Sequence, residues 1–284
     1  MSEPSTTEEY ELYTRIFHYP HEIIPQGTAA KKIMDRYYEL QTQGKEQGYV
    51  PFFVRITDIL LEDAVARIAG EHDLPDDEDL ITAEHARAYT QSMLEKYRAS
   101  LEDSSVEERG KIEIAKWLDQ HFEDEEEDEE FSFRKLVKDF EKSSFVPEEE
   151  DDVDHPEFVS IISFERGDDS DEGELLLVQV PTDNPADVPA YLPFGGWNEC
   201  PKTESQLAFT HYWYQKYGAV PGMLNGHDTL EFYVERPVTD PGESKQLAVE
   251  QFAFCSDIVM QVFNSFEALT DFINRGKQWY FWWD

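Results

Sequence analysis

Hydrophobic residues in the first half of the chain recur mostly at helical spacing. Within residues 28–47 they lie three or four positions apart and end near Gly48, which predicts a helix. Residues 49–56 are mostly β-branched or aromatic and predict a strand, after which Thr57 or Asp58 caps the next helix. Helices are predicted here over residues 57–69, 82–100, 106–121 and 131–142.

The second half alternates between strand and helix patterns. Residues 158–166 and 174–181 are predicted to form a β-hairpin across the turn sequence GDDSDEG, and residues 229–235 form another strand. Five consecutive aromatic residues precede the last residue, so residues 278–284 are expected as a strand with rings on both faces. Helices are predicted over residues 203–217, where Thr203 and Gln206 form a capping box, 243–255 and 265–274.

These elements place the protein in the α+β class. A chain of 284 residues is long enough for one large domain or two modest ones. We predict a mainly helical region over residues 1–145, with an acidic insert at 123–130. An acidic linker follows at 146–156, and residues 157–284 form an α+β domain with a mixed or antiparallel sheet.

Acidic residues strongly outnumber basic ones. The chain has 62 Asp and Glu against 24 Lys and Arg, a formal net charge of −38. Aromatic residues make up 14% of the chain, too much ring surface for a disordered acidic protein, so a folded core is expected. A surface of this charge repels nucleic-acid phosphates and anionic lipids and attracts cationic proteins or metal ions. Solubility alone is the alternative explanation of the charge.

Two acidic runs carry part of this charge. Without their 14 acids, 62 − 14 = 48 acids still face 24 bases, so the excess also belongs to the folded body. A basic protein is therefore the expected partner. The residues expected to contact it are Glu123, Asp124, Glu125, Glu126, Glu127, Asp128, Glu129, Glu130, Glu148, Glu149, Glu150, Asp151 and Asp152.

The segment between the two runs has an apolar stripe and a basic face. A helix docked on the core, with its basic face paired to neighbouring acids, explains both features. The alternative is a mobile element that a cationic partner displaces. The stripe consists of Phe133, Leu136, Val137 and Phe140, and the basic face of Arg134, Lys135 and Lys138.

Cysteine content and hydropathy bear on the cellular compartment. The chain has two cysteines, Cys200 and Cys255, and its first residues are polar and acidic, unlike a signal peptide. No apolar run approaches the roughly 18 residues that span a bilayer. We therefore expect a cytoplasmic protein with reduced thiols and no membrane contact.

Three aromatic-rich stretches in the second half occur together. They are PFGGWNECP at residues 193–201, FAFCSDIV at 252–259 and WYFWWD at 279–284, with HDTLEFYVERP at 227–237 between them. As a set they resemble the bacterial domain-of-unknown-function family numbered 4253. The resemblance covers about residues 157–284 and supports the predicted domain boundary. It implies no activity, because none is assigned to that family.

The PFGGWNECP loop is the best candidate for a functional site. Its two glycines let the backbone approach a ligand closely, and the next three residues offer a ring, an amide and a carboxylate. The alternative is a tight turn in which Trp197 fills the core. The candidate pocket residues are Trp197, Asn198, Glu199, Glu231, Cys255 and Asp257.

Motifs of known chemistry are weak or missing. A nucleophilic Cys255 would need a base such as His211 or His227, and the two cysteines lack the short paired spacing of zinc sites, so buried structural thiols are expected. The acidic loop that begins at Asp168 has Gln179 where an EF-hand needs Glu. The chain contains no GxSxG, Walker or Rossmann motif. We assign no catalytic residue and expect neither a metal nor a cofactor.

Two classes of function remain. The charge favours a protein-binding module, such as an immunity or antitoxin-type inhibitor or a DNA mimic, that acts on a basic protein. The alternative is an enzyme of unknown reaction with a pocket around residues 193–201. An accessory domain with only an assembly role is a third reading.

Overall fold

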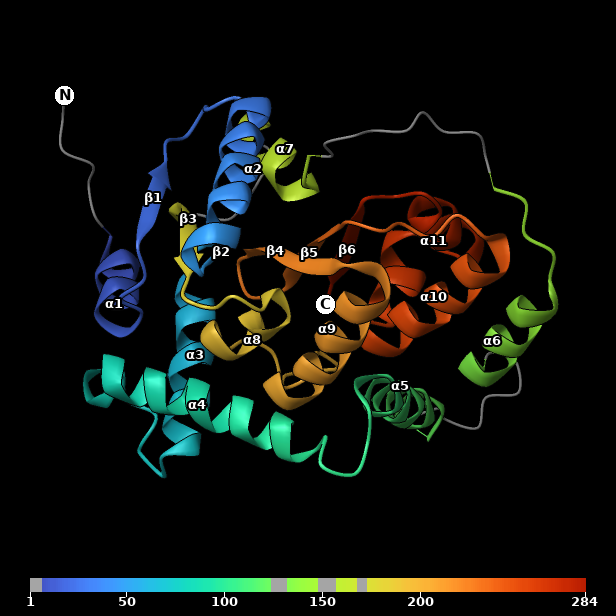
Figure 1. Ribbon diagram of the computed structural model, residues 1–284, viewed down its shortest axis with the longest axis horizontal. Helices are drawn as coiled ribbons and strands as arrows, with labels where there is room; N and C mark the ends of the chain where they lie inside the picture. The colour runs from blue at the N-terminus through green and yellow to red at the C-terminus, as the bar shows by residue number, and fades with distance from the viewer. Residues whose placement is uncertain (1–6, 124–131, 148–156, 168–172) are drawn as a thin grey trace.

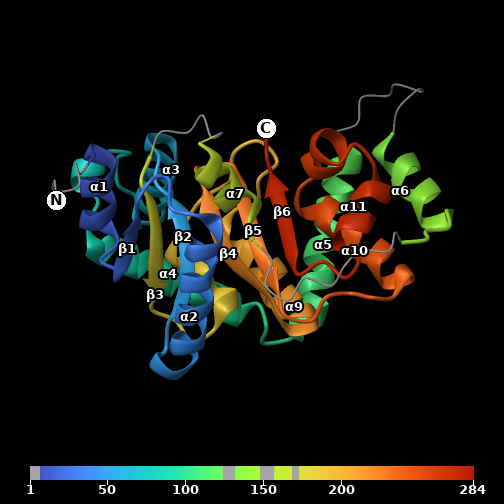
Figure 2. The same ribbon diagram turned by 90° about the horizontal axis from the view of Figure 1, so that it is seen from above.

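A mixed sheet of six strands, in the order β1-β3-β2-β4-β5-β6, forms the centre of the protein (Figures 1 and 2). The computed structural model describes residues 7–123, 132–147, 157–167 and 173–284. Strands β2 and β4 run parallel, and the other neighbouring pairs are antiparallel. The strands are β1 His21–Ile24, β2 Val50–Arg55, β3 Leu175–Val180, β4 Ala219–Asn225, β5 Thr229–Val234 and β6 Gln278–Trp282.

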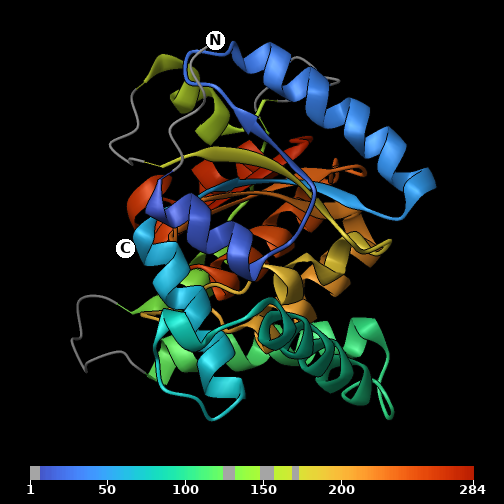
Figure 3. The same ribbon diagram turned by 90° about the vertical axis from the view of Figure 1, so that its left-hand side faces the viewer.

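Helices cover the two faces of the sheet unequally (Figure 3). Helices α2 and α7 lie on one face, α1, α3, α4, α8 and α9 on the other, and α5, α6, α10 and α11 gather beyond β6 (Figures 1 and 2). Within the described ranges, no helix is both long and apolar enough to cross a membrane. The helices are α1 Glu8–Ile16, α2 Ala30–Gln47, α3 Asp58–Glu71, α4 Ala83–Ala99, α5 Val106–Glu123, α6 Phe133–Lys142, α7 Val159–Arg166, α8 Val188–Tyr191, α9 Thr203–Tyr217, α10 Pro241–Phe254 and α11 Phe266–Ile273.

The alternation of side chains along β2 explains why the sheet needs helices on both sides. Phe52 and Val54 belong to the larger core cluster, under α3 and α9, and Phe53 belongs to the smaller one. In the smaller cluster the ring of Phe53 stacks on Tyr37 of α2, with 5.4 Å between centroids. A strand that is buried on both faces has a continuous apolar sequence, as the pattern in residues 49–56 predicts.

The α+β class is confirmed. Helices predicted from the spacing at residues 28–47, 57–69, 82–100 and 106–121 are present as α2, α3, α4 and α5. Thr57 caps α3, because its hydroxyl accepts a hydrogen bond from the Leu60 N–H at 3.2 Å. Strands from both predicted regions, residues 1–145 and 157–284, lie in the one sheet.

The hairpin predicted at residues 158–181 is wrong, since residues 159–166 form helix α7 and β3 pairs with β1 and β2 instead. The β-branched residues of this segment suggested a strand. Phe158, Ile161 and Phe164, however, are buried at helical spacing against α2. The carboxylate of Glu231 accepts hydrogen bonds from the first N–H groups of the helix, at 2.7 and 2.8 Å. A distant partner therefore decides this local structure.

Two further differences concern caps and strands. Lys202 is the N-cap of α9, so the predicted capping box of Thr203 and Gln206 is wrong. The Thr203 hydroxyl instead contacts Tyr89 at 2.8 Å, and the Gln206 amide donates to the carbonyl of Pro201 at 2.7 Å. Strand β4 has no counterpart in the prediction, because a proline and a glycine at its centre obscure the strand pattern.

Helix α6 docks on α10 and α5, as the apolar stripe predicts. Val137 and Phe140 are buried, and the Phe140 ring stacks on Phe266 of α11 with 4.6 Å between centroids. Arg134 lies over the ring of Phe122, near the end of α5. Most of the two acidic runs on either side of α6 lies outside the described residues; Glu123 ends α5, and its side chain is exposed.

The contact between α5 and α9 yields a first prediction. A Cβ atom at Gly110 would lie 2.4 Å from Cβ of Tyr212, so Gly110→Ala should destabilise the protein by about 1–3 kcal/mol despite the better helix propensity of alanine. Gly70→Ala in α3 is the matched control, because no heavy atom lies within 4 Å of its new Cβ. That variant should gain up to about 1 kcal/mol. Urea unfolding measures the free energy of unfolding of both variants. Equal changes in the two would contradict the close packing of α5 against α9.

Candidate functional site

The loop at residues 193–201 forms a tight turn at the edge of the larger core. The Gly196 N–H donates to the Cys200 carbonyl at 2.9 Å, and the Cys200 N–H donates to the Trp197 carbonyl at 2.9 Å. Gly195 and Gly196 have φ values of 79° and 81°, which favour glycine. The glycine pair therefore makes the turn, and it also lets Arg67 approach, because a Cβ at Gly196 would lie 2.4 Å from Nη1 of Arg67.

The first polar group beside this loop consists of Asp63 and Arg67 of α3 and His227 of the β4–β5 turn. The ring of Trp197 lies 5.1 Å from that of His227, and Asp63 is close to both Arg67 and His227. Burial raises the pKa of Asp63, although Arg67 and His227 oppose the shift. The buried Nε atom of Arg67 has no hydrogen-bond partner within the described structure, and the Trp197 side chain is among the groups that lower the pKa of Asp63.

These residues follow the parallel strands β2 and β4. Arg55 and Asn225, opposite each other in the register, end the two strands, and α3 and the β4–β5 turn begin just beyond them. The carboxyl ends of adjacent parallel strands are a common position for ligands in α/β sheets. The topology therefore explains why Asp63 and His227, far apart in the sequence, meet the same loop.

The second polar group joins Glu199 to His121 and Ser256. The Ser256 hydroxyl donates to Glu199, and Nδ1 of His121 lies 3.4 Å from the same carboxylate. The other ring nitrogen of His121 faces the Ala253 carbonyl at 3.2 Å. The nearby His121 ring is the main influence that lowers the pKa of Glu199, and the hydrogen bond from Ser256 is a further one. The loop is thereby tied to α5 and to the end of α10.

The end of the chain closes over the loop. The Asn198 amide donates to the backbone carbonyl of Asp284, and the Asp284 N–H donates to Asp257 at 3.1 Å. Asn198 itself has a φ of 43°. Four of the predicted pocket residues, Trp197, Asn198, Glu199 and Asp257, thus lie around one loop.

Glu231 does not join them. On β5 it points to the opposite face of the sheet, where it is fully buried under α7 and also accepts a hydrogen bond from Gln278. Burial raises its pKa, although the N–H groups of α7 oppose the shift. The side chain caps a helix, and the sheet separates it from the loop, so a pocket that contains all six predicted residues is not present.

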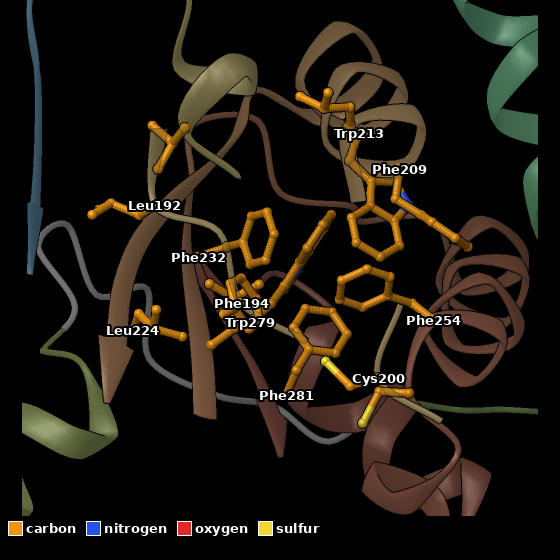
Figure 4. Close-up of a cluster of buried hydrophobic side chains, with 14 of the residues drawn as sticks. Leu192, Phe194, Cys200, Phe209, Trp213, Leu224, Phe232, Phe254, Trp279 and Phe281 are labelled. Carbon is orange, nitrogen blue, oxygen red and sulfur yellow. The ribbon is translucent and has the colours of Figure 1, made fainter. Parts of the chain in front are cut away.

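Both thiols are buried and free. Figure 4 shows Cys200 within a cluster of buried hydrophobic side chains. The Cys255 thiol donates to the Trp282 carbonyl at 3.0 Å. Burial raises the pKa of both thiols well above the usual range, the reverse of what a nucleophile requires. Structural thiols, the expectation from the sequence, fit this geometry.

The sequence analysis left out four residues of the two groups, and one of them, Ser256, lies next to the predicted residues Cys255 and Asp257. Asp63, Arg67 and His121 come from the N-terminal half, and their helices give no sign that these faces meet a loop more than 70 residues away. A signal was available for two of them, since Asp63 and Arg67 lie four positions apart and therefore share one face of α3. No group of three or more His, Cys, Asp or Glu side chains in the described ranges is placed to hold a metal ion.

The Glu199 contacts predict a pH-dependent contribution to stability. Since the folded-state pKa lies below the unfolded value, the contribution is present above about pH 4.5 and is lost as the pH falls through the folded value. Glu199→Gln should cost about 1 kcal/mol at pH 7, because a side chain that is 37% exposed is partly screened. The exposed Glu46→Gln is the control. Chemical unfolding between pH 7 and pH 4 measures the free energy of unfolding of the wild type and of both variants. If the stability difference between the wild type and Glu199→Gln does not change with pH, the predicted contribution of the Glu199 contacts is refuted.

The thiols predict slow alkylation. In native conditions at pH 8, neither Cys200 nor Cys255 should react with iodoacetamide at the rate of a free thiol, since both are buried and protonated. In urea both should react fully. Mass spectrometry of timed samples counts the modified thiols; rapid single labelling of the native protein would reveal an activated cysteine.

Comparison with known proteins gives one match, and it covers only a part of the chain. No curated protein and no solved structure matches it. One family model does, and its match begins at Leu176 in β3, later than the boundary near residue 157 that the resemblance suggested. The match contains the loop, α9, α10 and β6, and leaves Asp63, Arg67 and His121 outside. Residues 176–284 match the model of the family described as Domain of unknown function (DUF4253).

Proposed function

We propose that this protein is a cytoplasmic protein-binding module whose acidic surface recognises a basic protein. An immunity or antitoxin-type inhibitor, or a DNA mimic, would act in this way. The proposal rests on one observation, the surplus of carboxylates on the described body.

The surplus follows from the numbers of charged residues. Eighteen of the 62 acidic residues fall outside the described ranges, and all 24 Lys and Arg fall inside them, so 44 acids face 24 bases there. Even if each base paired with a different carboxylate, 20 carboxylates would remain without a basic counterpart. Ion pairs within the described part therefore cannot neutralise its surface.

Some of the Lys and Arg residues pair with buried carboxylates. Glu113 contacts Arg109 and Lys116 at 2.6 and 2.7 Å, and Glu250 contacts Lys216 at 3.3 Å. Glu231 is held by backbone N–H groups. These contacts involve three carboxylates and three bases, so they leave the surplus of 20 carboxylates in the rest of the described part unchanged.

One exposed segment concentrates this charge in an ordered part of the chain. Between α3 and α4, residues 73–79 contain five acidic side chains, all of them exposed, and Arg15 approaches one of them, Asp79, at 3.7 Å. A basic partner would meet fixed carboxylates here in addition to those of the acidic runs. Such complementarity mainly accelerates encounter and excludes wrong partners.

The alternative, an enzyme with a pocket around residues 193–201, has weaker support. Its favourable observation is the buried Nε atom of Arg67, which has no hydrogen-bond partner in the described structure and lies beside the loop. Against it stand the raised pKa values of both thiols and the position of Glu231 across the sheet.

The test is capture of partners from the native host at about 50 mM salt, with the full chain as bait. The matched bait carries Asp73→Asn, Asp76→Asn, Asp77→Asn and Glu78→Gln, which removes four charges from the exposed segment. The wild type should retain a protein of pI above about 9 more strongly than the variant does. With the purified partner, raising the salt from about 50 to about 200 mM should weaken binding about tenfold or more. The proposal fails if no basic protein is retained. It also fails if the affinity for the retained protein does not change with salt concentration.

A further inference from the structure

A cavity of about 420 Å³ lies beside α4. Helix α4 packs there against α1 and α8, at the blue and yellow end of the molecule (Figure 1). Apolar side chains of Ile16, Leu94 and Pro181 line part of it. Its volume falls within the range of about 300–1,000 Å³ that holds small ligands.

Two arginines stand at the ends of this cavity. Arg87 and Arg98 both line it from α4. Eleven residues on a helix return to within about 20° of the same direction, so both side chains leave α4 on one face, with Leu94 between them. Their Cα atoms are about 16 Å apart along the helix axis.

Neither arginine has an ion pair with any residue that the structure describes. Other arginines do, such as Arg36 with Glu22 at 2.5 Å and Arg109 with Glu113 at 2.6 Å. In a protein with this surplus of carboxylates, two neighbouring guanidinium groups without acidic partners are unexpected on the basis of composition. Acidic side chains do lie nearby, since Gln91 of the lining donates to Glu95 at 2.7 Å, but no described acid forms an ion pair with Arg87 or Arg98.

Two tyrosines form an aromatic wall between the arginines. The Tyr19 hydroxyl donates to the Tyr191 carbonyl at 3.1 Å, and the two rings meet edge to face with 6.2 Å between centroids. Burial raises the pKa of both phenols, and among the opposing influences are Arg87 on Tyr19 and Arg98 on Tyr191. Each arginine therefore lies near one of the two rings.

We propose that this cavity binds a small organic anion that has an acidic group at each end and an apolar or aromatic body. Each guanidinium offers planar paired donors that match a carboxylate or a phosphate, and the tyrosines and aliphatic side chains contact the body of the ligand. The chain's net charge favours a small ligand over a polyanion. A nucleic acid would bring many further phosphates against the acidic surface, whereas two acidic groups can both be placed at arginines.

The experiment titrates the full-length protein with biphenyl-4,4′-dicarboxylate by calorimetry and compares biphenyl-4-carboxylate, which lacks one acidic end. We expect saturable one-to-one binding of the dicarboxylate, several-fold tighter than that of the monocarboxylate. Arg87→Gln and Arg98→Gln should each weaken dicarboxylate binding about tenfold or more and reduce its advantage over the monocarboxylate.

The control is Arg166→Gln, which removes an exposed arginine at the end of α7 on the other face of the sheet. It should bind the dicarboxylate as the wild type does. Thermal unfolding of all three variants checks that each remains folded; both cavity arginines are exposed, so little change is expected. The proposal is overturned if the dicarboxylate does not bind at millimolar concentration. It is also overturned if the folded Arg87 and Arg98 variants bind it as tightly as the wild type or the control.

Discussion

The burial of Trp213 against the last strand is the interaction on which the rest of the structure depends. Its indole lies parallel to the ring of Phe281 of β6, with 5.7 Å between centroids, and meets Trp279 and Phe254 edge to face (Figure 4). Large aromatic side chains contribute most of the apolar area of a core. This cluster holds β6 at the sheet edge, and the chain end that follows can then reach Asn198 in the 193–201 loop.

The carboxylates occur in two settings, a few in the interior and the rest on the surface. The few carboxylates that enter the interior have specific partners: burial would raise the pKa of Glu113, but Lys116, Ser205 and Arg109 lower it overall. The surplus remains outside, because carboxylates without partners are too costly to bury. An exterior of this kind suits a basic protein partner. The cavity beside α4 is a local exception, where two exposed arginines without an ion pair in the described structure line a partly apolar space.

The DUF4253 match covers only a part of the structural unit. The larger core cluster combines Trp117 of α5 and Ile68 of α3 with Trp213 and Phe281 from the matched part. Strand β2, outside the match, lies between β3 and β4, inside it. Residues inside the match and residues outside it therefore both contribute to the loop and its polar groups. Asp63 and His121 belong to the candidate site as much as Trp197 does.

The sequence by itself determined the elements whose partners are close in the chain or whose pattern is strong. Helix α3 with its Thr57 cap and the aromatic strand β6 are examples, since apolar periodicity and a side-chain cap act locally. It also determined the acidic surplus. Tertiary structure alone decided that residues 159–166 are helical, because Glu231 caps them from across the chain. It also decided that His121 meets Glu199 and that Arg87 and Arg98 share one cavity. These contacts join segments whose approach depends on sheet order and helix packing, and no local pattern encodes that approach.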